Sequence, residues 1–217
     1  MFFETGLYLF NKPLGWTSFD VVNWVKHRSK TKKAGHAGTL DPAAEGLLLV
    51  AVGREYTRDI EKLAAQEKEY ICEITFGIVT DTGDSEGKIL SQKSVKITKN
   101  QLDEVLKGFI GKQMQIPPMY SAVKVQGRKL YELARQGIEI ERPPKEIEIK
   151  ELELTGFLPP DKAVLRIVCS KGTYIRTLCY NIGEKLGTGA YMSKLKRTRI
   201  GEYKLNAECI VPEGSRK

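Results

Sequence analysis

The stretch from Gly35 to Gly46 constrains this chain more than any other. It reads Gly-His-Ala-Gly-Thr-Leu-Asp-Pro-Ala-Ala-Glu-Gly, and its centre is a single carboxylate, Asp41. Glycines at its start allow backbone angles that other residues avoid, and Pro42 biases Asp41 toward an extended conformation. Residues 47–52 are then wholly apolar, which is typical of a strand buried on both faces. The pattern predicts a shaped loop that presents one acid and is mounted on a core strand.

Asp41 also has a purely structural interpretation. Asp-Pro is a common helix start, with Asp as the N-cap and Pro as the first helical residue. On the residues alone, the capping role and the presented acid are about equally well supported.

The complete string, followed by Leu-Leu at residues 47–48, resembles the signature of the TruB family of pseudouridine synthases, which isomerise a uridine in the T-loop of tRNA. The resemblance implies that Asp41 is the catalytic nucleophile and that His36 fills the space the flipped base leaves. It also implies an α+β class, namely the pseudouridine synthase fold. That fold has a mixed, largely antiparallel sheet flanked by helices and loops, with an RNA-binding cleft.

The N-terminal segment predicts a strand, a turn and a helix. Residues 7–10 read as the strand, and residues 11–18 (Asn-Lys-Pro-Leu-Gly-Trp-Thr-Ser) as the turn. Thr17 and Asp20 have the spacing of a capping box. The turn resembles the family's N-terminal motif, which implies a substrate-binding role for Lys12, although a plain capping turn explains its other residues equally well. The helix would bury one stripe, formed by Phe19, Val22 and Val25.

The charge of the chain favours a polyanionic partner. The formal net charge is +8 and the isoelectric point is about 9.2, but many basic proteins bind no nucleic acid. Residues 26–33 form a dense basic run next to the Asp41 loop. Such runs are usually solvated surfaces, whereas the resemblance implies phosphate contacts from this run and from two later ones. The implied contacts are Lys32, Lys33, Arg128, Arg135 and Arg197.

Residues 68–76 alternate like a strand with one buried face, so the pattern predicts Tyr70 in the core. Lys68-Glu69-Tyr70 nevertheless resembles the family's second motif, which implies that Tyr70 stacks on the target base. A buried ring whose hydroxyl reaches a cavity would satisfy both interpretations.

The remaining pattern predicts further helices and strands. Residues 56–63 have helical spacing, and residues 147–154 and 163–170 read as strands. Thr98 and Gln101 form a second capping box. The helix behind it would place these residues in the core: Leu102, Val105, Leu106, Phe109 and Ile110.

Two later motifs carry the rest of the resemblance. Residues 117–122 (Pro-Pro-Met-Tyr-Ser-Ala) and a basic helix ending at Gly137 resemble the family's thumb, at about residues 117–145; an ordinary surface helix is the alternative. Residues 172–178 resemble a motif whose Arg pairs with the catalytic Asp, which implies that Arg176 meets Asp41 and that Tyr174 lies at the substrate. Without the resemblance, Arg176 would be expected to face solvent. The closing segment places Leu195 where the family's backbone contacts the flipped base.

The resemblance covers about residues 7–203 of the 217. We expect one catalytic domain over residues 1–210, a short tail at 211–217 and no C-terminal PUA domain. The four cysteines lack metal-ligand spacing, so neither zinc nor disulfides are indicated, and no cofactor is expected. No signal peptide or membrane-length apolar run is present, which favours a cytoplasmic protein. The implied partner is tRNA, and we expect a monomer.

Two alternative functions stay open. One is an RNA-binding or tRNA-folding chaperone with the same fold, because binding and base flipping do not need Asp41. The other is a related pseudouridine synthase that acts on ribosomal RNA. Glu45 places a charge near the loop for which the sequence suggests no role.

Overall fold

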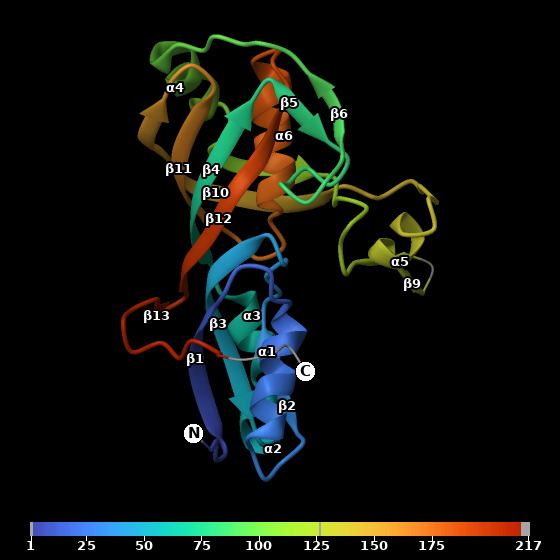
Figure 1. Cartoon of the computed structure of the whole chain (residues 1–217), viewed down its shortest axis with the longest axis vertical. Helices are drawn as coiled ribbons and strands as arrows, with labels where there is room; N and C mark the ends of the chain where they lie inside the picture. The colour runs from blue at the N-terminus through green and yellow to red at the C-terminus, as the bar shows by residue number, and fades with distance from the viewer. Residues whose placement is uncertain (1, 126, 214–217) are drawn as a thin grey trace. The chain divides into compact units, whose positions relative to one another are not determined.

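The computed structural model describes residues 2–125 and 127–213, which form two compact units (Figure 1). Unit 1 is the described part of Met1–Ile71 and Leu195–Lys217, and unit 2 is the described part of Cys72–Lys194. Two strands, β4 (Lys68–Phe76) and β12 (Ala190–Ile200), contribute residues to both units. Unit 2 is therefore one segment of the chain, whereas unit 1 is built from two.

A nine-stranded sheet has the order β1-β3-β12-β4-β11-β10-β7, with β2 paired to β3 and β13 paired to β12. β1 and β2 are antiparallel to β3, β10 is antiparallel to β7 and β11, and β12 runs parallel to β3. The predicted α+β class with a largely antiparallel sheet is confirmed. The strands not yet bounded are β1 (Gly6–Lys12), β2 (Ala34–Ala37), β3 (Ala44–Val52), β7 (Gly111–Gln115), β10 (Lys145–Leu158), β11 (Lys162–Cys169) and β13 (Tyr203–Lys204).

Strand β3 is the core of unit 1, as its apolar run predicts. Side chains alternate across a strand, so each face of β3 joins a different hydrophobic cluster. Leu48 and Val50 pack with the aromatic residues Phe3, Phe10 and Trp24. On the other face, the cluster consists of Ala37, Leu47, Leu49, Ile200 and Cys209.

Helix α1 (Ser18–His27) begins with the predicted capping box between Thr17 and Asp20. The predicted apolar stripe is partly wrong, because Phe19 is 59% exposed and lies 5.6 Å from the Lys26 ammonium. Val22 and Val25 of that stripe are buried as predicted, and the other buried residues of the helix are Ser18, Val21 and Trp24.

The helical pattern at residues 56–63 is divided between two short helices, α2 (Arg54–Thr57) and α3 (Ile60–Ala65). Neither helix has a fully buried residue. Ile60 and Leu63 are partly buried against the second cluster of unit 1, so α3 covers that face of β3.

Unit 2 contains α4 (Lys99–Lys107), which starts at the predicted capping box of Thr98 and Gln101. Only part of its predicted apolar face is buried, because the helix ends at Gly108 and Ile110 is 52% exposed. The other elements are β5 (Ile78–Thr80), β6 (Ile89–Gln92), β8 (Lys124–Val125), β9 (Arg128–Lys129), α5 (Leu130–Ala134) and α6 (Ile175–Lys185).

The predicted helix of the thumb-like segment is α5, and Gly137 follows it with a φ of +70°. The amide of Ile138 donates to the carbonyl of Leu133, which is the bond that a left-handed residue after a helix permits. The thumb at about residues 117–145, the catalytic domain over 1–210 and the tail at 211–217 stay predictions, and residues 214–217 lie outside the described residues. Within the described ranges, no helix has both the length and the apolar character needed to cross a membrane.

Candidate active site

Asp41 lies in the connection between β2 and β3, in unit 1, and is half-buried. The Ala44 amide donates to the Asp41 carbonyl at 3.0 Å, which closes a turn, and β3 begins at Ala44. No helix starts at Pro42, so the capping interpretation of Asp41 is wrong. The carboxylate belongs to a turn at the start of the central strand, where the loop interpretation placed it.

Lys12 is the last residue of β1 and is fully buried. Its ammonium donates to the carbonyls of Trp16 at 2.6 Å and Pro13 at 3.0 Å. Burial lowers the pKa of Lys12 to about 8, and the nearby Asp41 carboxylate opposes this fall. Lys12 therefore lies within electrostatic range of Asp41, where its proton is lost more easily than that of an ordinary lysine.

The predicted phosphate contact of Arg197 is wrong, because the side chain is buried. We expected it on the surface as a phosphate contact, but it lies on β12 with only 1% of its surface exposed. Its Nε donates to the Leu47 carbonyl at 2.8 Å and its Nη2 to the Gly38 carbonyl at 2.9 Å. Its guanidinium is thus committed to backbone carbonyls beside the Asp41 loop, which leaves it unsuited to a surface contact with RNA.

His36 lies on β2 opposite Val50, two residues before Gly38. Its pKa is lowered by burial and, to a smaller extent, by the charge of Arg197. A neutral imidazole is therefore favoured. In the part of the chain that the structure describes, the His36 Nδ1 is buried and has no hydrogen-bond partner.

Tyr70 and Leu195 also belong to unit 1. Tyr70 is 8% exposed, on the buried face of β4 that it shares with Cys72 and Ile74, so the strand pattern is confirmed. Leu195 lies on β12 opposite Ala44, where the connection that carries Asp41 ends. Stacking of Tyr70 on a base and a backbone contact of Leu195 with a base stay predictions.

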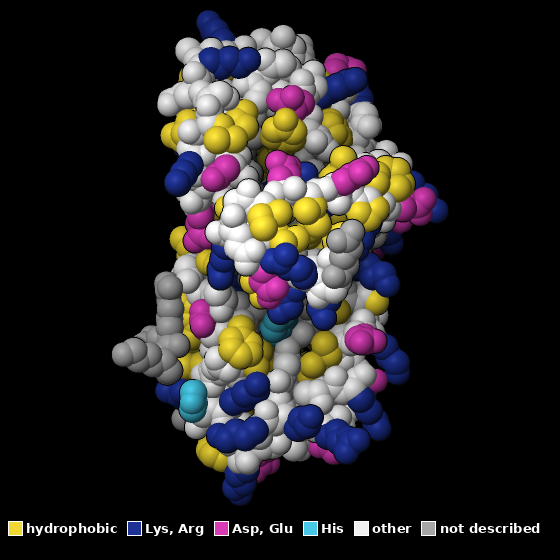
Figure 2. All heavy atoms as spheres, turned by 90° about the vertical axis from the view of Figure 1, so that its right-hand side faces the viewer, with side chains coloured by type: hydrophobic (Ala, Val, Ile, Leu, Met, Phe, Trp, Pro, Cys, Tyr) yellow, Lys and Arg dark blue, Asp and Glu magenta, His cyan; other side chains and the backbone are white. Residues whose placement is uncertain are grey.

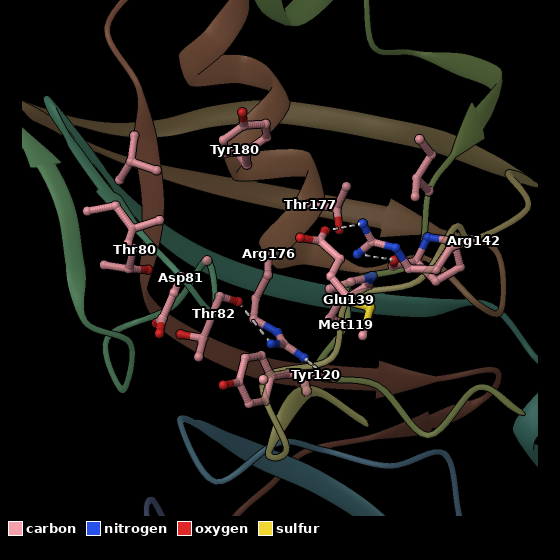
Figure 3. Close-up of a pocket in the computed structure, with 18 of the residues that line it drawn as sticks. Thr80, Asp81, Thr82, Met119, Tyr120, Glu139, Arg142, Arg176, Thr177 and Tyr180 are labelled. Carbon is pink, nitrogen blue, oxygen red and sulfur yellow. Dashed lines mark hydrogen bonds and ion pairs between the residues drawn. The ribbon is translucent and has the colours of Figure 1, made fainter. Parts of the chain in front are cut away.

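Arg176 lies in unit 2, in the first turn of α6, and its side chain is only 6% exposed. The guanidinium donates to the carbonyls of Thr82 at 3.0 Å and Tyr120 at 2.7 Å, and lies 3.5 Å from the Asp84 carboxylate. Figure 3 shows it pointing toward Thr82 and Tyr120, at the edge of a cavity of about 530 Å³. The interpretation of Arg176 as solvent-facing is wrong, because these three groups replace water around its charge.

Tyr174, two residues before Arg176, is the N-cap of α6. Gln115 holds its backbone by two bonds: the Gln115 amide donates to the Tyr174 carbonyl at 3.1 Å and its oxygen accepts from the Tyr174 amide at 2.8 Å. Gln115 contacts Tyr174 and Asp84 contacts Arg176, and neither was among the site residues predicted from the sequence. Residues 80–84 read Thr-Asp-Thr-Gly-Asp, a turn-forming segment from which Asp84 could have been found, whereas no local pattern marks Gln115.

The remaining basic candidates lie on the surface. Lys32 and Lys33 are exposed in unit 1, and Figure 2 shows more Lys and Arg than Asp and Glu side chains on the face of unit 1 that it presents. Arg128 and Arg135 are exposed in unit 2, where Arg128 donates to Gln136 at 2.9 Å and Arg135 lies 5.5 Å from the Tyr131 ring. Their contacts with RNA stay predictions, as does the pairing of Arg176 with Asp41.

Within the described residues, no group of three or more His, Cys, Asp and Glu side chains could hold a metal ion. The four cysteines are buried free thiols.

Two family models match the chain. "TruB family pseudouridylate synthase (N terminal domain)" matches residues 26–175, and "tRNA pseudouridylate synthase B C-terminal domain" matches residues 176–212. The first of these alone covers more than half of the chain.

Curated relatives named tRNA pseudouridine synthase B are similar along most of the chain. The protein of Fusobacterium nucleatum is 48% identical over 200 residues, which are 92% of this chain and 69% of the relative. The protein of Protochlamydia amoebophila is 50% identical over 198 residues, 91% of this chain and 75% of the relative. The protein of Bacillus subtilis is 49% identical over 211 residues, 94% of this chain and 68% of the relative.

Among solved structures, a chain of a Cbf5-Nop10-Gar1 complex has a TM-score of 0.74 and 31% sequence identity, and the match covers 95% of this chain and 52% of that one. This chain therefore spans about half the length of that solved chain. The family model that covers most of the sequence, the relatives near half identity and the shared fold lead to one conclusion: the chain belongs to the TruB family of pseudouridylate synthases.

Proposed function

We propose that this protein isomerises uridine to pseudouridine in the T-loop of tRNA, at position 55, with Asp41 as the catalytic residue. One observation carries the proposal: the family's signature string forms a half-buried turn that presents Asp41 beside the buried cations Lys12 and Arg197. Relatives near half identity over nine-tenths of the chain are named for this reaction on tRNA, which supports the substrate class.

The reaction suits a site with a single carboxylate. The bond from C1′ of the ribose to N1 of uracil breaks, and a bond from C1′ to C5 forms. The hydrogen on C5 is released to solvent and N1 takes up a proton, so the isomerisation needs neither an oxidant nor an energy source. The Asp41 carboxylate would attack C6 of the base or C1′ of the sugar, or assist formation of a glycal, and all three paths require it next to the flipped nucleotide.

The target base first has to leave the T-loop, at a cost of a few kcal/mol. Stacking on Tyr70 and phosphate contacts from exposed lysines such as Lys32 and Lys33 would offset that cost. His36, with a neutral ring favoured, is a suitable filler for the space that the base leaves in the loop.

We include Arg176 in the proposal as the cation that pairs with Asp41. The carbonyls of Thr82 and Tyr120 fix the guanidinium, so its direction is set before any RNA arrives. A guanidinium stays charged at any physiological pH and would keep the carboxylate ionised.

Tritium release from a tRNA transcript labelled with [5-³H]uridine tests the proposal, because the hydrogen on C5 leaves in every version of the mechanism. We expect Asp41→Asn to abolish release while tRNA binding stays within about tenfold of the parent, since a nucleophile contributes little to uniform binding. The matched control is Glu45→Gln, which removes a carboxylate four residues away that lies 3.5 Å from Lys196.

Residual turnover of Asp41→Asn above about a hundredth of the parent rate would contradict a role as nucleophile. A parent protein that refolds tRNA but releases no tritium would favour the chaperone. Release from a ribosomal RNA fragment but not from tRNA would favour the related synthase.

A further inference from the structure

The loop that carries Asp41 is held through its own backbone. Five consecutive carbonyls, from Gly38 to Pro42, each accept a hydrogen bond, and every donor belongs to unit 1. All five carbonyls of this stretch, which has no regular secondary structure, are thus paired. The donors are Arg197 Nη2 to Gly38 at 2.9 Å, Arg197 Nη1 to Thr39 at 3.5 Å, Ser18 Oγ to Leu40 at 3.0 Å, the Ala44 amide to Asp41 at 3.0 Å and the Gly15 amide to Pro42 at 2.8 Å.

Ser18 supplies the bonds closest to Asp41 on its N-terminal side. It is the first residue of α1 and is 2% exposed. Its hydroxyl donates to the Leu40 carbonyl at 3.0 Å and accepts from the Leu40 amide at 2.8 Å. A hydroxyl can do both at once, whereas alanine at this position would leave two buried backbone groups unpaired.

Arg197 joins the two ends of the loop. Its Nη2 binds the Gly38 carbonyl just after β2, and its Nε binds the Leu47 carbonyl on β3. The guanidinium fork spans carbonyls nine positions apart in the sequence, which a lysine ammonium cannot reproduce because it is a single point donor. Being 1% exposed, Arg197 acts on the loop rather than on a partner in solution.

We propose that Ser18 and Arg197 are positioning residues that fix the Asp41 carboxylate by holding the backbone on both sides of it. The inference rests on the proposed reactive role of Asp41. A reacting carboxylate has to be held within a fraction of an ångström, and a displacement of about 1 Å can cost about a hundredfold in rate. Neither residue touches the substrate in this proposal. Replacing either one should therefore lower the rate constant of the chemical step and leave the affinity for tRNA nearly unchanged.

Single-turnover tritium release, with enzyme in excess over [5-³H]uridine-labelled tRNA, measures the chemical step. We expect Ser18→Ala to lower its rate constant by about tenfold to a hundredfold, with the tRNA dissociation constant within about threefold of the parent. Ser18→Thr keeps the hydroxyl and should recover most of the rate. Arg197→Lys keeps the charge but not the fork, and should lose as much as Ser18→Ala.

Thr98→Ala is the matched control. Thr98 caps α4 in unit 2 through its hydroxyl, so the variant loses a helix cap without touching the Asp41 loop. Its rate constant should equal that of the parent. A loss in Thr98→Ala as large as in Ser18→Ala would show that rate follows global stability and would overturn the proposal.

Hydrogen exchange over residues 38–44 provides a measurement that does not depend on activity. The Leu40 amide should exchange at least about tenfold faster in Ser18→Ala than in the parent, because its acceptor is gone, and at the parent rate in Thr98→Ala. If the Leu40 amide of Ser18→Ala exchanges at the parent rate, Ser18 does not hold the loop and the proposal is overturned. If that amide exchanges fast but the rate constant for tritium release equals that of the parent, holding the loop does not serve catalysis and the proposal is overturned as well. If the parent protein itself releases no tritium, the proposed function fails, while exchange still decides whether Ser18 holds the loop.

Discussion

The buried charge of Lys12 predicts a specific dependence of stability on pH. Its ammonium is removed from water and binds two carbonyls, and burial lowers its pKa from 10.5 to about 8. In the unfolded chain the same group keeps its ordinary pKa, because it is surrounded by water. Folding therefore releases a proton from Lys12 in the pH range between the two values.

The sign follows from proton binding. Below about pH 8 Lys12 carries its proton in both the folded and the unfolded state, so it does not make the free energy of unfolding depend on pH. Between about pH 8 and 10.5 the unfolded chain binds more protons than the folded one. The free energy of unfolding therefore rises with pH across this range, and the contribution is lost again as the pH falls through 8. The interval of 2.5 pH units corresponds to about 3 kcal/mol at about 1.4 kcal/mol per unit.

Denaturant unfolding of the parent and of Lys12→Met, at several values from pH 7 to 11, measures this contribution. Other titrating groups cancel in the difference between the two proteins, which should grow by about 3 kcal/mol in favour of the parent as the pH rises. Lys88→Met, at an exposed lysine of unit 2, controls for the loss of one positive charge. A difference between parent and Lys12→Met that stays constant within about 1 kcal/mol would refute the reasoning.

Three further predictions concern other contacts. Asp84→Asn should lower the free energy of unfolding in urea by about 3 kcal/mol or more, because it leaves Arg176 as a buried charge without that carboxylate. Gly46→Ala should lower the melting temperature far more than Gly111→Ala. The two φ values are similar, +104° and +102°, but the new Cβ would clash with the Arg197 carbonyl oxygen at Gly46, whereas at Gly111 it would meet no atom within 4 Å. In filter-binding titrations, Lys33→Ala should reduce the slope of log tRNA affinity against log salt by about 0.7 to 0.9 if Lys33 contacts one phosphate, and an unchanged slope would remove it from the interface.

Patterns of residues that are close together in the sequence predicted much of the fold. The buried strand at β3, the alternating strand at β4 and both capping boxes follow from residues within a few positions of one another, and all are confirmed. The string around Asp41 likewise predicted a shaped turn at the start of a core strand. Each of these features depends on backbone preferences and on a periodicity that the segment carries by itself.

Long-range contacts account for what the sequence did not predict. Arg197 reads as part of a basic surface run, yet it is buried because carbonyls about 150 positions earlier accept its hydrogen bonds. Phe19 reads as a core residue of α1, but it is exposed, and Trp24 lies in the core instead. Burial of a charge depends on partners from elsewhere in the fold, and no local pattern of the segment reveals them.

The interruption of unit 1 by unit 2 sets an order of events during synthesis on the ribosome. The segment Cys72–Lys194 emerges before Leu195 and Arg197, so a nascent chain has made all of unit 2 while the Gly38 and Leu47 carbonyls still lack the Arg197 guanidinium. We therefore expect the Asp41 loop to be among the last parts of the fold to acquire its native protection. Proteolysis of stalled nascent chains of increasing length measures this, and protection of the loop before residue 197 has emerged would contradict it.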